Sequence, residues 1–207
     1  ALRATAVFAV LMAAPVSAPV MAAPAAIQLT AEQVDVMKNI NTFFNSYKSL
    51  RGDFVQISPK GNTVKGVMMI SKPGRLRFEY APPTPLLIVS DGKWLTIKNT
   101  AKEKGDQVPL AATPLKLIVA PQVDILREAV VTSFDQQDNI ATVALADRKG
   151  SMGGQIVLVF DTAANELQQW IIIDGKGQRT TVQIGNLERD VALNPKLFQV
   201  TIKRRER

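Results

Sequence analysis

The sequence predicts an α+β fold in which about ten or eleven antiparallel strands follow one another and two or three helices pack against them. Three observations indicate this class. Residues Arg75–Tyr80 alternate strictly between charged and apolar side chains, which is the period of a strand with one buried face. The turn dipeptides Pro73-Gly74 and Asp91-Gly92 separate short apolar runs. Only the segment at residues 30–50 carries a long apolar stripe at helical spacing.

The first residues are predicted to form a secretory signal peptide, residues 1–22, rather than part of the fold. Arg3 precedes an apolar run over residues 4–16, which is too short to cross a membrane. Val20-Met21-Ala22 is a small-residue cleavage site of the usual type. An uncleaved anchor is the alternative. Residues 23–207 are then expected to form a single domain, without disulfides because the chain has no Cys.

A helix is predicted over residues 30–50. Thr30 and Gln33 have the spacing of a capping box, and Gly52 suits the position just beyond a helix end. Such a helix must bury its apolar stripe against another element, and the sheet is the only large partner that the sequence offers. The stripe consists of Val36, Met37, Ile40, Phe43, Phe44, Tyr47 and Leu50.

The dipeptide Asp91-Gly92 predicts a hairpin with a two-residue loop, in which Ser90 faces Lys93 and Ile88 faces Leu95. Because both faces of this hairpin carry apolar side chains, we expect the sheet to be covered on one side and partly covered on the other. One face carries Leu86, Ile88, Leu95 and Ile97, and the other carries Leu87, Val89 and Trp94.

Further elements follow from local patterns along the chain. Residues 99–107 are polar and are expected to form a surface loop. Thr113-Pro114 begins a short apolar helix that Pro121 ends, residues 124–129 add another turn, and residues 194–198 form a helical turn. The remaining strands are predicted at residues 54–57, 62–70, 86–90, 130–134, 140–146, 155–160, 167–173, 179–187 and 199–203.

The types of residue present exclude most catalytic chemistry. The chain has no His and no Cys, which excludes thiol mechanisms and most metal sites and leaves little acid–base chemistry near neutral pH. It has neither a P-loop nor a G-x-S-x-G motif. The Gly-rich stretch at residues 150–154 lies between two predicted strands, which favours a hairpin over a phosphate loop. We therefore predict no catalytic residue, no metal ligand, no cofactor and no enzymatic activity.

The formal net charge of +7 is spread along most of the chain. In an exported protein such a charge meets anionic lipid head groups more often than nucleic acid, so no nucleic-acid partner is expected. A charged surface that only keeps the protein in solution is the alternative. Helices packed on the concave face of a bent sheet would form an apolar cleft, but a plain α+β core without a cleft has the same periodicity.

A family resemblance favours the cleft. Phe54-Val55-Gln56, then SKPGRLRFEY at residues 71–80 and LLIVSDGKWL at residues 86–95, resemble in order and spacing the outer-membrane lipoprotein carrier family of the LolA type. The apolar helix after Thr113 and the turn at Asp174-Gly175 also fall in the expected order. The resemblance extends over residues 31–203.

The resemblance implies an unclosed antiparallel β half-barrel with helices as a lid over an apolar cavity. In the periplasm, this cavity would hold the acyl chains of lipoproteins. An inner-membrane lipoprotein-releasing transporter would supply them and an outer-membrane lipoprotein acceptor would receive them, and the carrier would act as a monomer. The predicted acyl-chain site comprises Val36, Ile40, Phe43, Met68, Ile70, Leu76, Phe78, Leu86, Ile88, Leu95, Ile97, Leu117 and Ile118.

Lys72 falls where many members of the family have an Arg that holds the lid closed through hydrogen bonds. The Lys ammonium is a compact charge, whereas the Arg guanidinium is planar and presents several N–H donors in a fixed arrangement. The presence of Lys at this position therefore puts the strength of lid closure in question. Three other functions are compatible with the residue patterns. They are a lipid- or lipoprotein-sensing periplasmic binding module, a secreted enzyme and a structural envelope protein.

Overall fold

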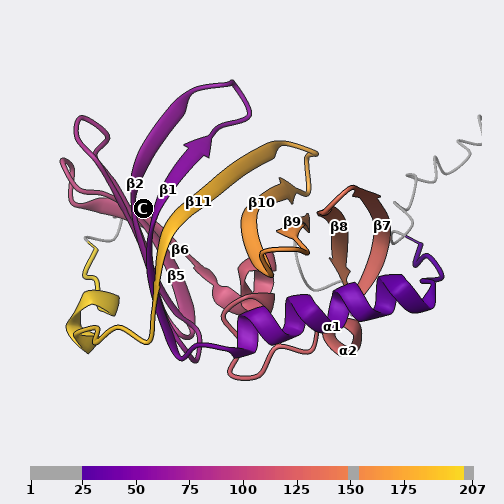
Figure 1. Ribbon diagram of the computed structural model, residues 1–207. Helices are drawn as coiled ribbons and strands as arrows, with labels where there is room; N and C mark the ends of the chain where they lie inside the picture. Colours follow the sequence, from indigo (N-terminus) through magenta and orange to yellow (C-terminus); the bar gives the residue numbers. More distant parts are fainter. Residues whose placement is uncertain (1–24, 149–153, 203–207) are drawn as a thin grey trace, which may run out of the picture.

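The computed structural model describes residues 25–148 and 154–202. These residues form eleven strands of one antiparallel sheet, two α-helices and three short 3-10 helices (Figure 1). The α+β class expected from the sequence is therefore confirmed. The predicted signal peptide, residues 1–22, lies outside the described residues.

The elements fall into two series of strands and a connection between them. The first series contains α1 (Ala31–Asn45), β1 (Ser49–Ile57), β2 (Thr63–Ser71), β3 (Arg75–Tyr80), β4 (Leu86–Asp91), β5 (Trp94–Asn99) and β6 (Lys104–Pro109). The connection contains η1 (Leu110–Ala112), η2 (Pro114–Leu117) and α2 (Ile125–Glu128). The second series contains β7 (Ala129–Gln137), β8 (Ile140–Asp147), β9 (Gly154–Asp161), β10 (Glu166–Asp174), β11 (Arg179–Arg189) and η3 (Pro195–Phe198).

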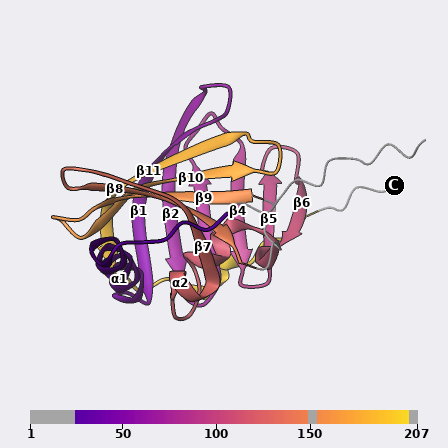
Figure 2. The same cartoon turned by 90° about the vertical axis from the view of Figure 1, so that its right-hand side faces the viewer.

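The sheet consists of two meanders that meet at one long pair of strands. Strands β1 to β6 lie side by side in chain order, and so do β7 to β11. The pairing of β11 with β1 joins the meanders and leaves β6 and β7 as the two edges among the described strands. Figure 2 shows strands of the second meander crossing over those of the first, so the sheet is strongly bent. This is the unclosed half-barrel that the family resemblance implied.

The chain passes from one edge of the sheet to the other between β6 and β7. This connection, residues 110–128, carries η1, η2 and α2. Figure 1 shows α1 and the connection together at one end of the bent sheet. We call α1 and residues 110–128 the lid, and we call the face of the sheet that is turned toward it the inner face.

Helix α1 begins as predicted and ends earlier than predicted. The N–H of Gln33 donates to the Thr30 hydroxyl over 3.3 Å, and the N–H of Thr30 donates to the Gln33 side chain over 3.0 Å, which confirms the capping box. The helix ends at Asn45, and both Leu50 and Gly52 belong to β1. Leu50 was misassigned because its spacing fits both the helical stripe and the buried alternation of β1.

The β4–β5 hairpin differs from its predicted register by two residues. Ser90 pairs with Leu95 instead of Lys93. The loop is wider because Oδ1 of Asp91 accepts hydrogen bonds of 2.8 Å from the backbone N–H groups of Lys93 and Trp94. A shift of two residues leaves every side chain on its predicted face. The inner face of this hairpin thus carries Leu86, Ile88, Leu95 and Ile97, as predicted.

Three other local predictions differ from the structure. Residues 104–107 of the predicted loop at 99–107 belong to the edge strand β6, which is polar and pairs on one side only among the described strands. The short helix predicted after Thr113 is the 3-10 helix η2, with Pro114 at its start, but it ends at Leu117 and not near Pro121. The Thr113 hydroxyl donates to the Leu110 carbonyl and does not cap this helix. Residues 199–202 form no strand, and Ile202 lies against Gly105 on the outer face of β6. Residue 203 lies outside the described residues.

The sheet is covered on its inner face and partly covered on its outer face, as the apolar pattern predicted. Phe78 and the alternate residues of β3 belong to the core cluster on the inner face. On the outer face, Nη1 of Arg77 donates to the carbonyl of Leu197 in η3 over 3.0 Å. The guanidinium of Arg75 lies 5.7 Å from the centre of the Phe198 ring. The charged face of β3 is therefore partly covered by η3.

Candidate functional site

Most of the predicted acyl-chain residues form one buried cluster between the lid and the inner face of the sheet. Each residue of this cluster is at most 9 % exposed. Side chains of the lid and of the sheet therefore pack together and fill the space between them. The buried members are Val36, Ile40 and Phe43 of α1, Met68, Ile70, Leu76, Phe78 and Leu95 of the sheet, and Leu117 and Ile118 of the connection.

The other predicted residues lie toward the free edge of the first meander. Ile97 is 40 % exposed, whereas Leu95, the next residue on the same face of β5, is buried in the cluster. Val108 of β6 pairs with Leu95 and is 38 % exposed. Sequence reasoning missed Val108 because it is a lone apolar residue in a polar segment. We call this surface the apolar edge strip; it consists of Leu86, Ile88, Leu95, Ile97 and Val108.

The turn between β2 and β3 contacts both parts of the lid. The Lys72 ammonium donates a hydrogen bond to the carbonyl of Phe44, near the C-terminal end of α1. The N–H of Gly74 donates to the carbonyl of Val119 in the connection over 2.8 Å. A Cβ on Gly74 would lie 2.7 Å from the Cα of Gly92, so this turn also packs against the β4–β5 turn. One turn of the sheet thus holds the two parts of the lid in place.

The surroundings of Lys72 lower the pKa of its ammonium group. Its Nζ lies 4.8 Å from the centre of the Tyr47 ring, in the position of a cation–π contact. Partial burial lowers the pKa of Lys72 to about 8, because the charged form loses hydration. The side chain can still donate to Phe44 when it is neutral, since an amine keeps N–H groups.

The Phe54-x-Gln56 motif is explained by contacts inside the first meander. The ring of Phe54 meets those of Phe78 and Tyr80 edge to face, at 5.1 and 5.0 Å between ring centres. The Tyr80 hydroxyl donates to Oε1 of Gln56 over 2.6 Å. Burial raises the pKa of Tyr80 to about 12. The motif therefore supplies the polar partner of a tyrosine in an aromatic cluster.

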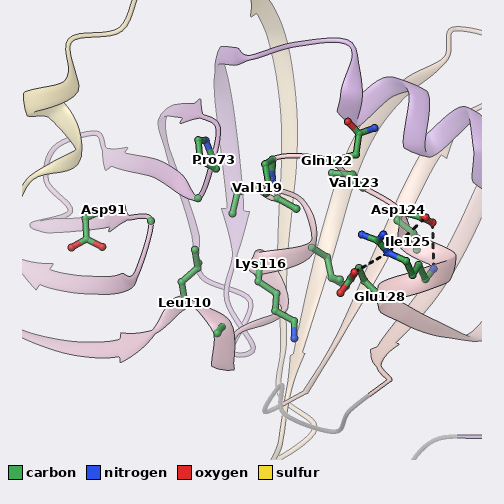
Figure 3. Close-up of a pocket in the computed structure, with 17 residues that line it drawn as sticks. Pro73, Asp91, Leu110, Lys116, Val119, Gln122, Val123, Asp124, Ile125 and Glu128 are labelled. Carbon is green, nitrogen blue, oxygen red and sulfur yellow. Dashed lines mark hydrogen bonds and ion pairs between the residues drawn. The ribbon is translucent and has the colours of Figure 1, made fainter.

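A cavity of about 640 Å³ lies at the margin of the lid (Figure 3). The turns at Pro73 and Asp91 line one side, and Ile125 and Glu128 of α2 line the other. Leu117 is the one predicted acyl-chain residue among its lining residues. The cavity thus lies beside the buried cluster and not within it, where the two turns of the sheet meet the connection.

Comparisons with known proteins decide the family. The family model described as outer membrane lipoprotein carrier protein LolA matches residues 45–201. The chain belongs to the LolA family. A protein of Alkalilimnicola ehrlichii named outer-membrane lipoprotein carrier protein is 30% identical over 205 residues, which span 93% of this chain and 89% of that protein. A protein of Methylobacillus flagellatus with the same name is 26% identical over 185 residues, 82% of this chain and 86% of that protein.

A solved structure shares the fold of this LolA-family chain. It is a DUF1329 family protein from Desulfovibrio piger, with a TM-score of 0.50 and 11% sequence identity. The match spans 80% of this chain and 95% of that chain. At this identity the likeness concerns the fold alone.

As a member of the LolA family, the chain is a carrier protein of the LolA type. This confirms the family that its motifs indicated. Within residues 25–148 and 154–202, no group of three or more acidic, His or Cys side chains is placed to hold a metal ion. Nor does that part of the chain contain a helix with the length and apolar character needed to cross a bilayer.

Proposed function

We propose that this LolA-family chain is exported by a signal peptide at residues 1–22 and works in the periplasm as a monomeric carrier. It binds the acyl chains of lipoproteins released by an inner-membrane transporter and delivers them to an outer-membrane acceptor. Its family supports the carrier role. The proposal that the protein binds acyl chains rests on one observation: the apolar edge strip is continuous with the buried cluster beneath the lid.

Solvation explains what such a carrier must do. Hiding one CH₂ group from water is worth ~0.8 kcal/mol, so an anchor of several acyl chains left in water costs on the order of tens of kcal/mol. Apolar contacts are not directional, so the carrier can exchange them for contacts with an acyl chain. In the empty carrier, lid residues such as Ile40 and Phe43 occupy the interior. Net affinity is then the difference between two sets of apolar contacts, which permits release.

The apolar edge strip is where cargo makes first contact in this proposal. Ile97 is exposed while the lid is closed, and Leu95 on the same face is already part of the buried cluster. An acyl chain lying along Ile97 therefore touches the core before the lid moves. Displacement of the lid side chains then extends the contact from β5 toward β3 and β2.

The test compares two exposed apolar residues on opposite faces of β5. Ile97 on the inner face is 40 % exposed, and Trp94 on the outer face is 38 % exposed. Capture of a triacylated lipoprotein from inner-membrane vesicles that hold the releasing transporter is measured for Ile97→Glu and Trp94→Glu. We expect Ile97→Glu to reduce capture by about tenfold, because a charge replaces an apolar contact. Trp94→Glu should change capture by less than about twofold.

Thermal unfolding of both variants provides the control for folding, since substitutions at exposed positions leave stability nearly unchanged. Equal losses of capture in the two variants would reject the inner face as the acyl-chain site. Unchanged capture by a folded Ile97→Glu protein would reject the strip as the point of first contact.

A further inference from the structure

The side chain of Tyr47 ends in a buried hydroxyl group. Among the described residues it is the one buried side-chain polar atom without a hydrogen-bond partner. The whole residue is 4 % exposed. A buried hydroxyl without a partner reduces the stability of a folded protein, whereas phenylalanine would fill nearly the same space without that loss. The hydroxyl therefore points to a partner that is bound only in another state of the protein.

Tyr47 lies where the lid joins the sheet. It follows the end of α1 and precedes Ser49, the first residue of β1. Its ring meets the ring of Phe43 edge to face at 5.9 Å between centres, and Nζ of Lys72 lies 4.8 Å from its centre. The guanidinium of Arg189 lies 5.2 Å from the centre of the Phe43 ring. The residue thus stands at the margin of the apolar interior, beside two cationic side chains.

The Tyr47 hydroxyl is a donor at any physiological pH. Burial raises its pKa far above the usual value, and the charge of Arg189 opposes this rise only in part. The proton therefore stays on the oxygen. Lys72, whose Nζ lies over the Tyr47 ring, favours a partner with a partial negative charge, which is the character of a carbonyl oxygen. Arg189 is already ion-paired with Glu166 over 3.4 Å.

We infer that Tyr47 donates a hydrogen bond to a carbonyl oxygen of the cargo, at the ester or amide group that joins an acyl chain to the rest of the molecule. This inference rests on the proposed function, because it requires acyl chains to enter beneath the lid. The carbonyl stands where the hydrocarbon ends, and Tyr47 stands where the apolar interior ends. The hydrogen bond selects acyl groups over plain hydrocarbon of the same length, because a buried donor is left unpaired by a ligand without an acceptor.

Tyr80 provides a matched control for Tyr47. Both tyrosines are buried in the same core cluster, but the Tyr80 hydroxyl already donates to Gln56 over 2.6 Å. Removing the hydroxyl from Tyr80 breaks a hydrogen bond that exists in the empty protein. Removing it from Tyr47 breaks none. Phenylalanine substitutions at the two positions should therefore change stability in opposite directions.

The experiment uses two ligands that differ only in the carbonyl group, 1-palmitoylglycerol and its ether analogue 1-O-hexadecylglycerol. Their binding to the parent protein, Tyr47→Phe and Tyr80→Phe is measured by displacement of an apolar fluorescent probe. We expect Tyr47→Phe to weaken binding of the ester about five- to tenfold and to leave binding of the ether unchanged. Tyr80→Phe should affect both ligands alike. Without ligand, Tyr47→Phe should melt at a higher temperature than the parent, and Tyr80→Phe at a lower one.

Each contrary result has a definite meaning. If the parent binds both ligands equally well, or if Tyr47→Phe keeps a preference for the ester, the inference is wrong while acyl-chain binding stands. A lower melting temperature for Tyr47→Phe would mean that the hydroxyl has a partner in the empty protein, which also overturns the inference. If neither ligand binds the parent, the proposed function fails and the inference fails with it.

Discussion

Asn45 and Val123 exchange two hydrogen bonds of 2.8 Å each, since the side-chain amide of Asn45 donates to the carbonyl of Val123 and accepts from its N–H. Asn45 is the last residue of α1, and Val123 lies just before α2. One helical turn earlier, Asn41 accepts a third hydrogen bond of 3.1 Å from the N–H of Ile125. These bonds join the two parts of the lid, so we expect α1 and the connection to move as one body.

Substitution of Asn45 by Asp tests this joint movement. Asp keeps the acceptor but loses the donor, and its charge faces the carbonyl of Val123 and the negative end of α1. The free energy of separating α1 from the connection should fall by about 1–2 kcal/mol. Hydrogen exchange at the N–H groups of Val123 and Ile125 should accelerate about tenfold.

Thr42→Ala is the control for the Asn45 substitution, because Thr42 is exposed on the same helix. Its effect on exchange in the connection should be small. If Asn45→Asp accelerates exchange in α1 alone and leaves Val123 protected, the two parts of the lid move independently.

The lid should close more tightly as pH rises through the range in which Lys72 titrates. In the closed state the pKa of Lys72 is about 8, and opening returns the side chain to water, where its pKa is near the ordinary value of 10.5. The open state therefore binds more protons between these pH values, and raising the pH favours the closed state. Tyr47 and Tyr80 stay protonated there because burial raises both pKa values. Affinity for an apolar fluorescent probe should fall several-fold between pH 7 and pH 9.5.

Lys72→Arg separates this titration from other effects of pH. Arg stays charged throughout the range, so its variant should lose the pH dependence. Its planar group offers more donors to the lid, so we also expect weaker probe uptake than in the parent at pH 7. A variant with the same pH profile as the parent would show that another group controls the lid.

Gly74→Ala should loosen the contact between the β2–β3 turn and the lid. Gly74 has φ of 74°, and an added Cβ would lie 2.7 Å from the backbone of Gly92. Gly61 is a matched control, with φ of 81° and no atom within 4 Å of an added Cβ. Both substitutions cost about 1–2 kcal/mol of strain, but only Gly74→Ala displaces the turn that donates to Val119.

Urea denaturation measures both effects. We expect Gly74→Ala to lower the free energy of unfolding by at least about 1 kcal/mol more than Gly61→Ala, and to increase probe uptake. Equal losses of stability and unchanged uptake would show that the turn does not hold the lid.

Local patterns predicted much of the fold correctly. Strand β3 has its predicted bounds, Arg75–Tyr80, because its alternation of charged and apolar residues is strict. The two faces of the β4–β5 hairpin were predicted correctly although its register was not. A register shift of two residues leaves each side chain on the same face of the sheet. Strand β6 was missed because an edge strand with polar residues on both faces has no apolar period.

The candidate site was predictable to the extent that it depends on apolar faces. Ile40, Phe43 and Phe78 followed from the helical stripe, the strand alternation and the family pattern, and they meet in one cluster. Val108 joins the apolar edge strip only because β6 pairs with β5. The surroundings of the unpaired Tyr47 hydroxyl come from α1, the β2–β3 turn and β11, which no local pattern brings together.

The sequence by itself determined which face of α1 and of the strands with an apolar period is buried, because burial acts on side chains at the fixed periods of a helix and a strand. It also determined the turns, since Gly, Pro and Asp specify backbone conformation locally. Only the tertiary structure decided that β11 pairs with β1 and that the connection crosses from β6 to β7 as part of a lid. Pairing between distant segments depends on which faces meet in space, and periodicity along the chain carries no information about the partner.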